Sequence, residues 1–509
     1  ELAASDVTTV AFSRPFVANI DGHLRFGWEE NRTTAVARRT VMASYVPDAA
    51  ASRWIDEEIV EPAPILAAPN RDLALAGNGS VALLVTSNAV YLATIGQEWT
   101  AGVQSAIEVA LAWRSPRYDD TTGEPVPPAL ARLVDSGWLR GALRLVGLLL
   151  TGYTAWVLWF GRDSLINPVF GMFYVLLWVG LVPASLLLGP VWKALSPFRT
   201  LTAAVARLTG GRAERGPLPY PERWGMWPAA IGLFAFVWME LANPHADELG
   251  AVRLWICAYT VLMTAGALMF GDAFLESADP FEVYSSLVAR LSVWGRRDGV
   301  LVVRSPLANL ATTPARPGLV AVVAVLFGST GFDSFKDSSF WIRTVQESSS
   351  PLLLTDLALV GFCLLVGLVF VAGTTMTGTH AETRRRDLPR RFAHSVVPIV
   401  VGYVVAHYLS FLVVAGQTTL IRMSDPMSDG SNLFGTADLS VSYWLAGHPT
   451  LLANVKVLAV VTGHVLGVVA AHDRAMHLLP RRHQLTGQLP LLFAMVGFTV
   501  GGLWLLFSA

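Results

Sequence analysis

Residues 351–376 read PLLLTDLALVGFCLLVGLVFVAGTTM, a run of twenty-six residues with a single charged side chain, Asp356. At about 1.5 Å per residue, a helix of this length extends about 39 Å, enough to cross about 30 Å of hydrocarbon. The composition of the whole chain agrees, because 53% of its 509 residues are apolar and only 15% are charged. The stretch therefore predicts a transmembrane helix in a multi-pass membrane protein.

Further apolar windows on both sides are long enough to cross a bilayer. The nine predicted spans are 139–160, 168–192, 224–242, 251–271, 318–333, 351–376, 393–418, 451–472 and 488–507. The fifth is the shortest and contains Gly328 and Gly331, so we expect it to be broken or shifted. The predicted fold class is an all-α polytopic protein of about nine transmembrane helices, embedded in the lipid bilayer.

The N-terminal part of the chain has a different character. Residues 1–138 carry 17 acidic and 10 basic side chains, a balance of −7, whereas the remaining 371 residues carry 21 and 27, a balance of +6. Short β-type runs separated by turn signals predict a small extramembrane β or α+β region over residues 1–113. Residues 114–138, rich in Pro, Asp and Arg, are predicted to form a linker to the transmembrane domain, residues 139–509.

The side of the membrane on which this region lies depends on the stretch 81–113. The stretch is apolar in places but is interrupted by glutamines and glutamates, which makes it a weak span candidate. Without a span there, we expect the region on the cytoplasmic side. A span hidden in 81–113 is the alternative, and it places residues 1–80 outside.

Basic loops predict the orientation of the helices. Loop 193–223 carries six basic residues against two acidic ones, and loop 377–392 holds five arginines. Such loops stay in the cytoplasm. With nine spans, every loop agrees with one topology, in which loop 425–449 and the C-terminus lie outside. The apolar segment 281–294 is expected to lie along the cytoplasmic interface.

Ionisable residues at membrane depth are informative, because each costs roughly 2.5–3.5 kcal/mol unless it finds water or a partner. The deepest are His407 and His464, followed by Glu240, Asp356 and Lys456. The two histidines lie on helices joined by one outside loop, so we expect them to be neighbours. Two interpretations stay open: hydrogen bonds between helices, or a metal ligand or proton relay.

A second group of polar residues lies at the predicted cytoplasmic boundary. Asp272, Glu276 and Asp279 follow the fourth span at positions i, i+4 and i+7, on one face of a continuing helix. Several histidines end or begin other spans at the same level, and such a set suits zinc, manganese or iron. The predicted metal ligands are His394, His407, His464, His472 and Asp473, with Asp272 or Glu276 as candidate base, and His380 and Glu382 nearby. A solvated or ion-paired boundary is the alternative.

Other chemical signatures are lacking in the sequence. There is no phosphate-binding loop, nucleophile elbow, Cys-x-x-Cys pair or His-Glu-x-x-His motif. Nucleic-acid binding is disfavoured, because the basic residues follow the pattern that membrane orientation requires. Cys257 and Cys363 lie in apolar stretches, so we interpret them as packing residues.

Four stretches carry a resemblance to a known family. They are NPVFGMFYVLLWVGLVP at 167–183, DPFEVYSS at 279–286, LFGSTGFDSF at 326–335 and GHVLGVVAAHDR at 463–474. They resemble bacterial multi-pass membrane proteins labelled fenitrothion hydrolase-like, over about residues 110–509. The resemblance implies a hydrolase of organophosphorus esters in the bacterial cytoplasmic (inner) membrane. Residues 1–110 depart from the family, whose members begin with a signal peptide, a short outside segment and an additional span.

Three hypotheses of different classes follow. The first is a metal-dependent hydrolase of organophosphorus esters, whose metal would lower the pKa of bound water to about 7. The second is a non-enzymatic subunit or assembly factor, with protein partners in a larger membrane complex. The third is a transporter of an ion or small solute that uses the buried ionisable groups as its pathway.

Overall fold

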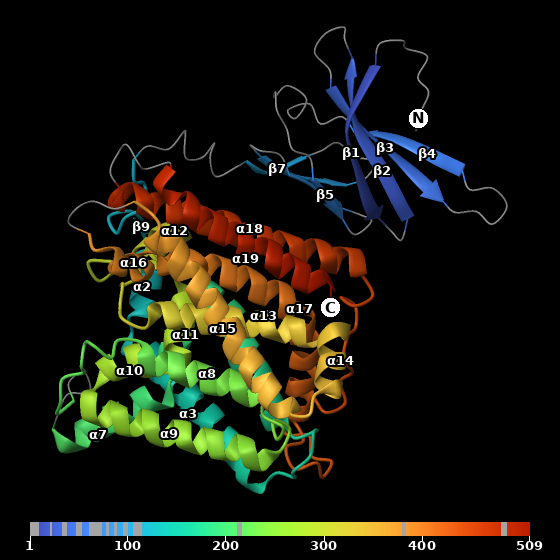
Figure 1. Cartoon of the computed structure of the whole chain (residues 1–509). Helices are drawn as coiled ribbons and strands as arrows, with labels where there is room; N and C mark the ends of the chain where they lie inside the picture. Colours follow the sequence, from blue (N-terminus) through green and yellow to red (C-terminus); the bar gives the residue numbers. More distant parts are fainter. Residues whose placement is uncertain are drawn as a thin grey trace. The chain divides into compact units, whose positions relative to one another are not determined.

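The computed structural model describes eight strands between residues 10 and 104, and residues 115–210, 216–378, 383–479 and 486–508. The chain divides into two compact units, Glu1–Arg114 and Ser115–Ala509 (Figure 1). Unit 1 contains strands and unit 2 is almost entirely helical.

Unit 1 holds two antiparallel sheets of four strands each, coloured blue in Figure 1. The first sheet consists of β1 (Val10–Ile20), β2 (His23–Arg32), β3 (Arg38–Val46) and β4 (Arg53–Val60), and the second of β5 (Ala74–Gly77), β6 (Val81–Val85), β7 (Ala89–Thr94) and β8 (Thr100–Gln104). Each strand pairs with the next one along the chain, so both sheets are meanders. Strands β6 to β8 occupy much of the weak span candidate 81–113, and residues 105–113 lie outside the described part.

Unit 2 contains the apolar windows. Its helices are α2 (Pro128–Val134), α3 (Gly137–Phe160), α4 (Pro168–Phe170), η1 (Gly171–Val179), α5 (Leu181–Leu188), α6 (Val191–Leu195), α7 (Pro197–Thr209), α8 (Trp227–Leu241), α9 (Leu249–Phe270), α10 (Asp272–Ala278), α11 (Pro280–Ala289), α12 (Pro306–Ala311), α13 (Leu319–Lys336), α14 (Ser339–Glu347), α15 (Pro351–Thr375), η2 (Arg385–Asp387), α16 (Leu388–Phe392), η3 (Ala393–Val396), α17 (Val397–Arg422), α18 (Pro449–Leu478), η5 (Thr486–Gln488) and α19 (Leu489–Ser508). Figure 1 shows α7, α10, α12 and α16 at one end of these helices, which we call the basic end, and α14 at the other.

Seven helical segments in the described part are long and apolar enough to cross a membrane, which makes the chain a multi-pass membrane protein. They are α3, α9, α13, α15, the segment Arg385–Arg422 that contains α17, α18 and α19. An eighth is counted if Pro168–Val179 and Leu181–Leu188, bent by 42°, form one span. Helix α8 is apolar but only 15 residues long. The count of nine spans therefore stays a prediction.

Helix α13 corrects one expectation. The fifth span, expected to be broken or shifted, is a continuous helix of 18 residues, so it is not broken, and it ends at Lys336 rather than at residue 333. Gly328 serves close packing, because a Cβ there would lie 2.5 Å from the Cα of Cys363 on α15. Because the neighbouring backbone occupies this space, Gly328 marks a helix contact and not a break.

The second predicted span is the one that bends. Residues Gly171–Val179 form a π-helix, and the amide of Gly180 donates to the carbonyl of Val175, five residues earlier. Gly189, at φ +86°, and Pro190 then turn the chain into α6. Wide turns of this kind interrupt the regular helix and occur often at functional sites.

Residues 115–138, predicted as a linker, are joined to the helices by hydrogen bonds. Strand β9 (Glu124–Pro125) pairs with β11 (Val300–Val303), which pairs with β10 (Trp294–Arg297). The amide of Arg117 donates to Asp473 Oδ1 at 2.7 Å. This segment therefore belongs to unit 2.

Helices α10 and α11 form a hairpin that enters the bundle and returns. Its tip is Asp279, which accepts a hydrogen bond from the Tyr259 hydroxyl, and Tyr259 lies about 16 Å before the end of α9. On the return side, Trp294 Nε1 donates to the carbonyl of Leu187 at the end of α5. Nine of the ten residues of α11 are buried, so the expected position along the interface, which would leave one face exposed, is wrong.

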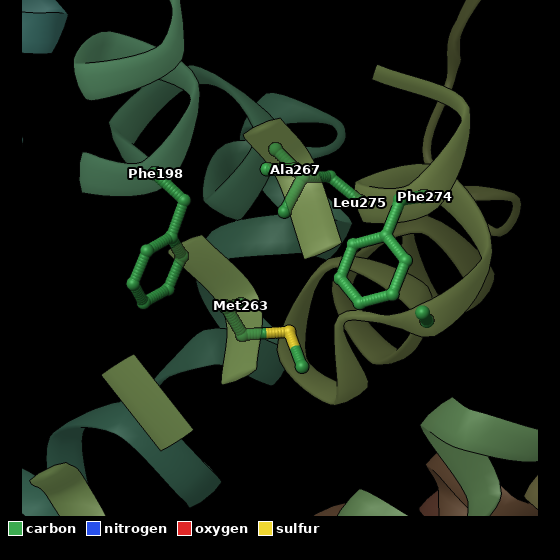
Figure 2. Close-up of a cluster of buried hydrophobic side chains, with 6 residues drawn as sticks. Phe198, Met263, Ala267, Phe274 and Leu275 are labelled. Atoms are coloured by element: carbon green, nitrogen blue, oxygen red, sulfur yellow. The ribbon is translucent and has the colours of Figure 1, made fainter. Parts of the chain in front are cut away.

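Apolar packing holds α10 against α9 and α7. Figure 2 shows Phe198, Met263, Ala267, Phe274 and Leu275 directed toward one another, and all five are buried. The ring of Phe274 lies over Gly266, where a Cβ would come within 2.1 Å of it. This cluster fixes the hairpin beside α7, the helix that carries Arg199.

Candidate functional site

Helices α13 and α17 bring six polar side chains together inside unit 2. Three come from the last turn of α13 and three from the middle of α17, where the contacts of Tyr403, His407 and Tyr408 all lead to α13. We call the set the Asp333 cluster; its members are Asp333, Ser334, Lys336, Tyr403, His407 and Tyr408.

The carboxylate of Asp333 is the centre of the cluster. Its Oδ2 lies 3.0 Å from His407 Nε2 and accepts a hydrogen bond of 2.6 Å from the Tyr408 hydroxyl. Its Oδ1 lies 2.8 Å from the ammonium of Lys336. Both oxygens are therefore satisfied by donors, and two of the three donors are titratable nitrogen groups.

His407 connects this carboxylate to a line of hydroxyl groups. Its Nδ1 lies 3.0 Å from Ser334 Oγ, and the Tyr403 hydroxyl donates to that same oxygen at 2.8 Å. A neutral His407 that donates from Nε2 to Asp333 must accept at Nδ1, so Ser334 is the donor there. In the order Tyr403, Ser334, His407, Asp333, each of the first three groups then donates to the next, and Asp333 accepts.

The cluster is buried but opens at one edge. The side chains of Asp333 and His407 are 10% and 17% exposed, and that of Lys336 is 33% exposed. Tyr403, Tyr408 and Ser334 are buried. Because charged groups among apolar helices are costly to retain, a set of this size indicates a role beyond packing.

The two residues predicted as bases belong to an ionic network at the basic end. Asp272 Oδ2 lies 3.0 Å from Arg199 Nη1, and Glu276 Oε1 lies 2.6 Å from Lys193 Nζ and 3.7 Å from Arg199 Nη2. Partial burial raises the pKa of Glu276, but the hydrogen bond and charge of Lys193 and the charge of Arg199 outweigh it and lower the pKa. These contacts match the ion-paired alternative, since a carboxylate held by cations is a weak base.

Arg199 also forms a buried pair that the sequence analysis did not propose. Its Nε donates to Glu282 Oε2 at 2.8 Å and its Nη2 to Oε1 at 2.5 Å, a two-pronged contact. Glu282 is 1% exposed and Arg199 is 8% exposed. Arg199 thus balances a charge that α11 carries into the protein interior.

Asp279, at the tip of the hairpin, is fully buried. It accepts hydrogen bonds from Trp192 Nε1, the Tyr259 hydroxyl and the backbone amide of Phe281. Burial, and next the charge of Glu282, raise the pKa of Asp279 to about 7, against the effect of these three donors. The amide contact also caps the first turn of α11.

The predicted metal ligands lie in separate surroundings. His407 belongs to the Asp333 cluster, whereas His464 Nδ1 lies 2.6 Å from Thr499 Oγ1 on α19. His472 Nδ1 contacts the amide of Gln488, and His394 is buried in η3. Asp473 accepts a hydrogen bond from the backbone amide of Arg117.

Metal-ligating residues do not gather in the described part of the chain. No group of three or more His, Cys, Asp or Glu side chains suited to a metal ion is found there. His380 and Glu382 lie outside the described residues. The divalent metal of the hydrolase hypothesis therefore stays a prediction.

Comparison with known proteins gives no further assignment. Searches against protein-family models, curated proteins and solved structures found no match. The function is consequently argued from the geometry of unit 2.

The residue that organises the site, Asp333, was not among the predicted site residues. Asp333 is the last residue of the predicted fifth span, and a carboxylate at the end of a span needs no special explanation because it can reach water. A usable signal was present: in the sequence GFDSFK, Asp333 and Lys336 are three residues apart at the end of an apolar helix. That spacing places opposite charges on one helix face and predicts an ion pair.

Proposed function

We propose that this protein transports an ion or a small solute across the membrane, with the Asp333 cluster as the site that binds the coupling cation. The observation that supports the proposal is the His407–Asp333–Lys336 arrangement inside apolar helices. Buried ionisable groups that pair with one another are typical of ion and proton pathways.

The contrast with His464 supports this interpretation. His464 has one hydrogen bond, to a threonine on the next helix, which is what a packing histidine needs. His407 contacts a carboxylate and a hydroxyl and lies against two tyrosine rings. An interhelical hydrogen bond does not require this many polar partners.

The hydroxyl of Ser334 lets the site change protonation state without losing contacts. With His407 neutral, Ser334 donates to Nδ1. When His407 takes up a second proton, Nδ1 becomes a donor to Ser334 Oγ, and the serine proton turns to the carbonyl of Thr330, 3.3 Å away. One proton is thereby bound or released through a rotation about a single bond.

Interrupted helices next to the site fit the same function. The bent pair η1 and α5 and the hairpin α10–α11 place helix ends inside the bundle. Transporters use such discontinuous helices around their binding sites, because free backbone groups and helix dipoles are then directed at the ion. The hydrolase and assembly-factor hypotheses draw no comparable support from the described residues.

The test is ion flux in proteoliposomes that contain the full chain. Currents are recorded while a proton or a sodium gradient is imposed, for the wild type, Asp333→Asn, His407→Gln and the matched control His464→Gln. We expect at least a tenfold lower current for the Asp333 and His407 variants and a near-normal current for the control. A wild-type current no larger than that of empty liposomes, or equal currents in all variants, would overturn the proposal.

A further inference from the structure

Glu240 lies on the face of α8 that meets the bent helix and the hairpin. It follows Phe236 by one turn, so both side chains are directed the same way. The ring of Phe236 packs 5.1 Å from Trp178 of η1 and 5.3 Å from Phe281 of α11. Glu240 is therefore placed between these elements and not toward lipid.

Two polar atoms in this region have no partner within the described part of the chain. They are the Oε2 atom of Glu240 and the hydroxyl of Tyr284, and both atoms are sealed from solvent. Tyr284 is 1% exposed, with its ring 5.0 Å from Trp178. Glu240 and Tyr284 interact electrostatically. Buried polar atoms are nearly always satisfied, and one internal water between these two atoms would satisfy both.

Charge balance links Glu240 to the Asp333 cluster. Lys336 forms its ion pair with Asp333 and also interacts electrostatically with Glu240, and the two carboxylates repel each other. Two carboxylates that share one ammonium become neutral with one bound proton. Because the Oε2 atom of Glu240 is buried without a partner, an ionised Glu240 is costly unless the ammonium lies on it, and a bound proton removes that cost.

The charged and titratable groups that surround Glu240 come from four elements. Asp333 and Lys336 lie on α13, Tyr284 on α11, Tyr174 on η1 and Tyr408 on α17. Lys336 is the one lysine or arginine among them in the described residues, and His407 on α17 also contacts Asp333. With His407 as a neutral donor, the position of the Lys336 ammonium decides which carboxylate is ionised.

We propose that Glu240 binds and releases one proton in exchange with Asp333, with Lys336 as their shared counter-ion and the Tyr284 hydroxyl holding the water that carries the proton. With Lys336 on Asp333, the proton resides on Glu240. When the proton leaves Glu240 through the water and arrives on Asp333, the ammonium moves to Glu240, and the net charge of the three groups is unchanged. The inference rests on the proposed transport function and names the proton as its coupling cation.

The first measurement is infrared difference spectroscopy of the reconstituted protein during a pH change, where a protonated carboxyl gives a C=O band distinct from that of a carboxylate. We expect one such band in the wild type, its loss in Glu240→Gln and its retention, at a shifted position, in Glu240→Asp. The conservative Asp variant keeps the test valid if the Gln variant folds poorly. A wild-type band that persists unchanged in Glu240→Gln would overturn the inference.

The second measurement is proton flux in the same proteoliposomes. We expect Glu240→Gln to lower the flux at least tenfold and Tyr284→Phe to lower it severalfold, whereas the control Tyr220→Phe, whose hydroxyl contacts the carbonyl of Gly225, leaves it unchanged. Normal flux in Glu240→Gln together with lost flux in Asp333→Asn would refute the inference and leave the transport function standing. Sodium flux without proton flux in the wild type would also refute the inference and leave the transport function standing. Absence of any ion flux in the wild type would refute the transport function, and the infrared band would then still decide whether Glu240 holds a proton.

Discussion

His407 Nε2 and Asp333 Oδ2 lie 3.0 Å apart although 74 residues separate them in the sequence. The contact joins α13 and α17, two helices that are mostly apolar outside the Asp333 cluster. A Tyr408 hydroxyl on the same oxygen and a lysine on the other complete the arrangement, so the carboxylate is held by donors from both helices. Ionisable groups that pair in this way inside apolar helices are typical of ion and proton pathways, which is the basis of the proposed function.

Removing the tyrosine hydroxyl measures how strongly Asp333 is held. Tyr408→Phe deletes a donor to a carboxylate, whereas Tyr153→Phe deletes a donor to the carbonyl of Met423. Hydrogen bonds to charged groups contribute about twice as much as neutral ones, so we expect losses of about 2 and about 1 kcal/mol. Thermal unfolding in detergent gives both values. Equal losses would mean that the Tyr408 contact is not charge-assisted.

The buried pair of Arg199 and Glu282 is predicted to be essential for stability. Arg199→Ala leaves Glu282 buried without a partner, and we expect a loss of about 3–5 kcal/mol. Lys193→Ala is the matched control, because its pair with Glu276 is 44% and 39% exposed and should contribute less than about 1 kcal/mol. The double variant Arg199→Leu with Glu282→Leu should recover part of the loss. Similar unfolding temperatures for the two single variants would contradict this account.

The raised pKa of Asp279 predicts how the stability of the protein changes with pH. Its pKa in the folded protein is about 7, above the ordinary 3.8, so folding favours the protonated form. The stabilisation is therefore complete below about pH 4, declines as the pH rises and is absent above about pH 7. As the pH rises from about 4 to about 7, the wild type should therefore lose stability relative to Asp279→Asn.

The informative quantity is how the difference in stability between the wild type and Asp279→Asn changes with pH. Asparagine cannot accept hydrogen bonds at its nitrogen, so the variant loses the Trp192 contact at every pH, which adds a constant offset. Unfolding temperatures of both proteins are measured from pH 4 to pH 8. Asp298→Asn, in an exposed turn, is the control and should follow the wild type. A difference between wild type and Asp279→Asn that does not vary with pH would count against the raised pKa.

The sequence predicted the long helices well because hydropathy alone determines them: Pro351–Thr375 matches the predicted 351–376 closely. It did not predict the hairpin. In the sequence, the residues of α11 resemble an interfacial segment, because a charged Glu282 without a visible partner is expected to need contact with water. Its actual partner, Arg199, lies 83 residues earlier, and local sequence gives no means of pairing them.

The same limit applied to the site. His407 was identified because a histidine within an apolar helix is visible in the sequence. Its expected neighbour was His464, on the adjoining span, but its partners are Asp333 and Ser334 of α13. Adjacency along the chain indicates which helices pack, and α17 and α18 do pack closely. It does not indicate which face each side chain occupies.

Close packing of α17 and α18 depends on two facing glycines. A Cβ at Gly463 would lie 2.4 Å from the carbonyl oxygen of Pro398 and 3.2 Å from the Cα of Gly402. Gly463→Ala must push the helices apart, and we expect a loss of about 1–3 kcal/mol. Gly497→Ala is the control, since nothing lies within 4 Å of its Cβ position, and it should be neutral or stabilise by up to about 1 kcal/mol. Equal effects on thermal unfolding would argue against the contact.

The predicted orientation is tested by cysteine accessibility in intact cells. Cys257 and Cys363 are first replaced by alanine, and single cysteines are then introduced by Ser440→Cys and Leu218→Cys, at two positions that are exposed in the structure. A membrane-impermeant thiol reagent should label residue 440 and leave residue 218 protected until the cells are opened, because loop 193–223 carries six basic residues and loop 377–392 five arginines. Arg385→Cys should behave like residue 218, on the same argument. Labelling of 218 and 385 in intact cells, with protection of 440, would invert the topology and show that the arginine asymmetry does not orient this protein.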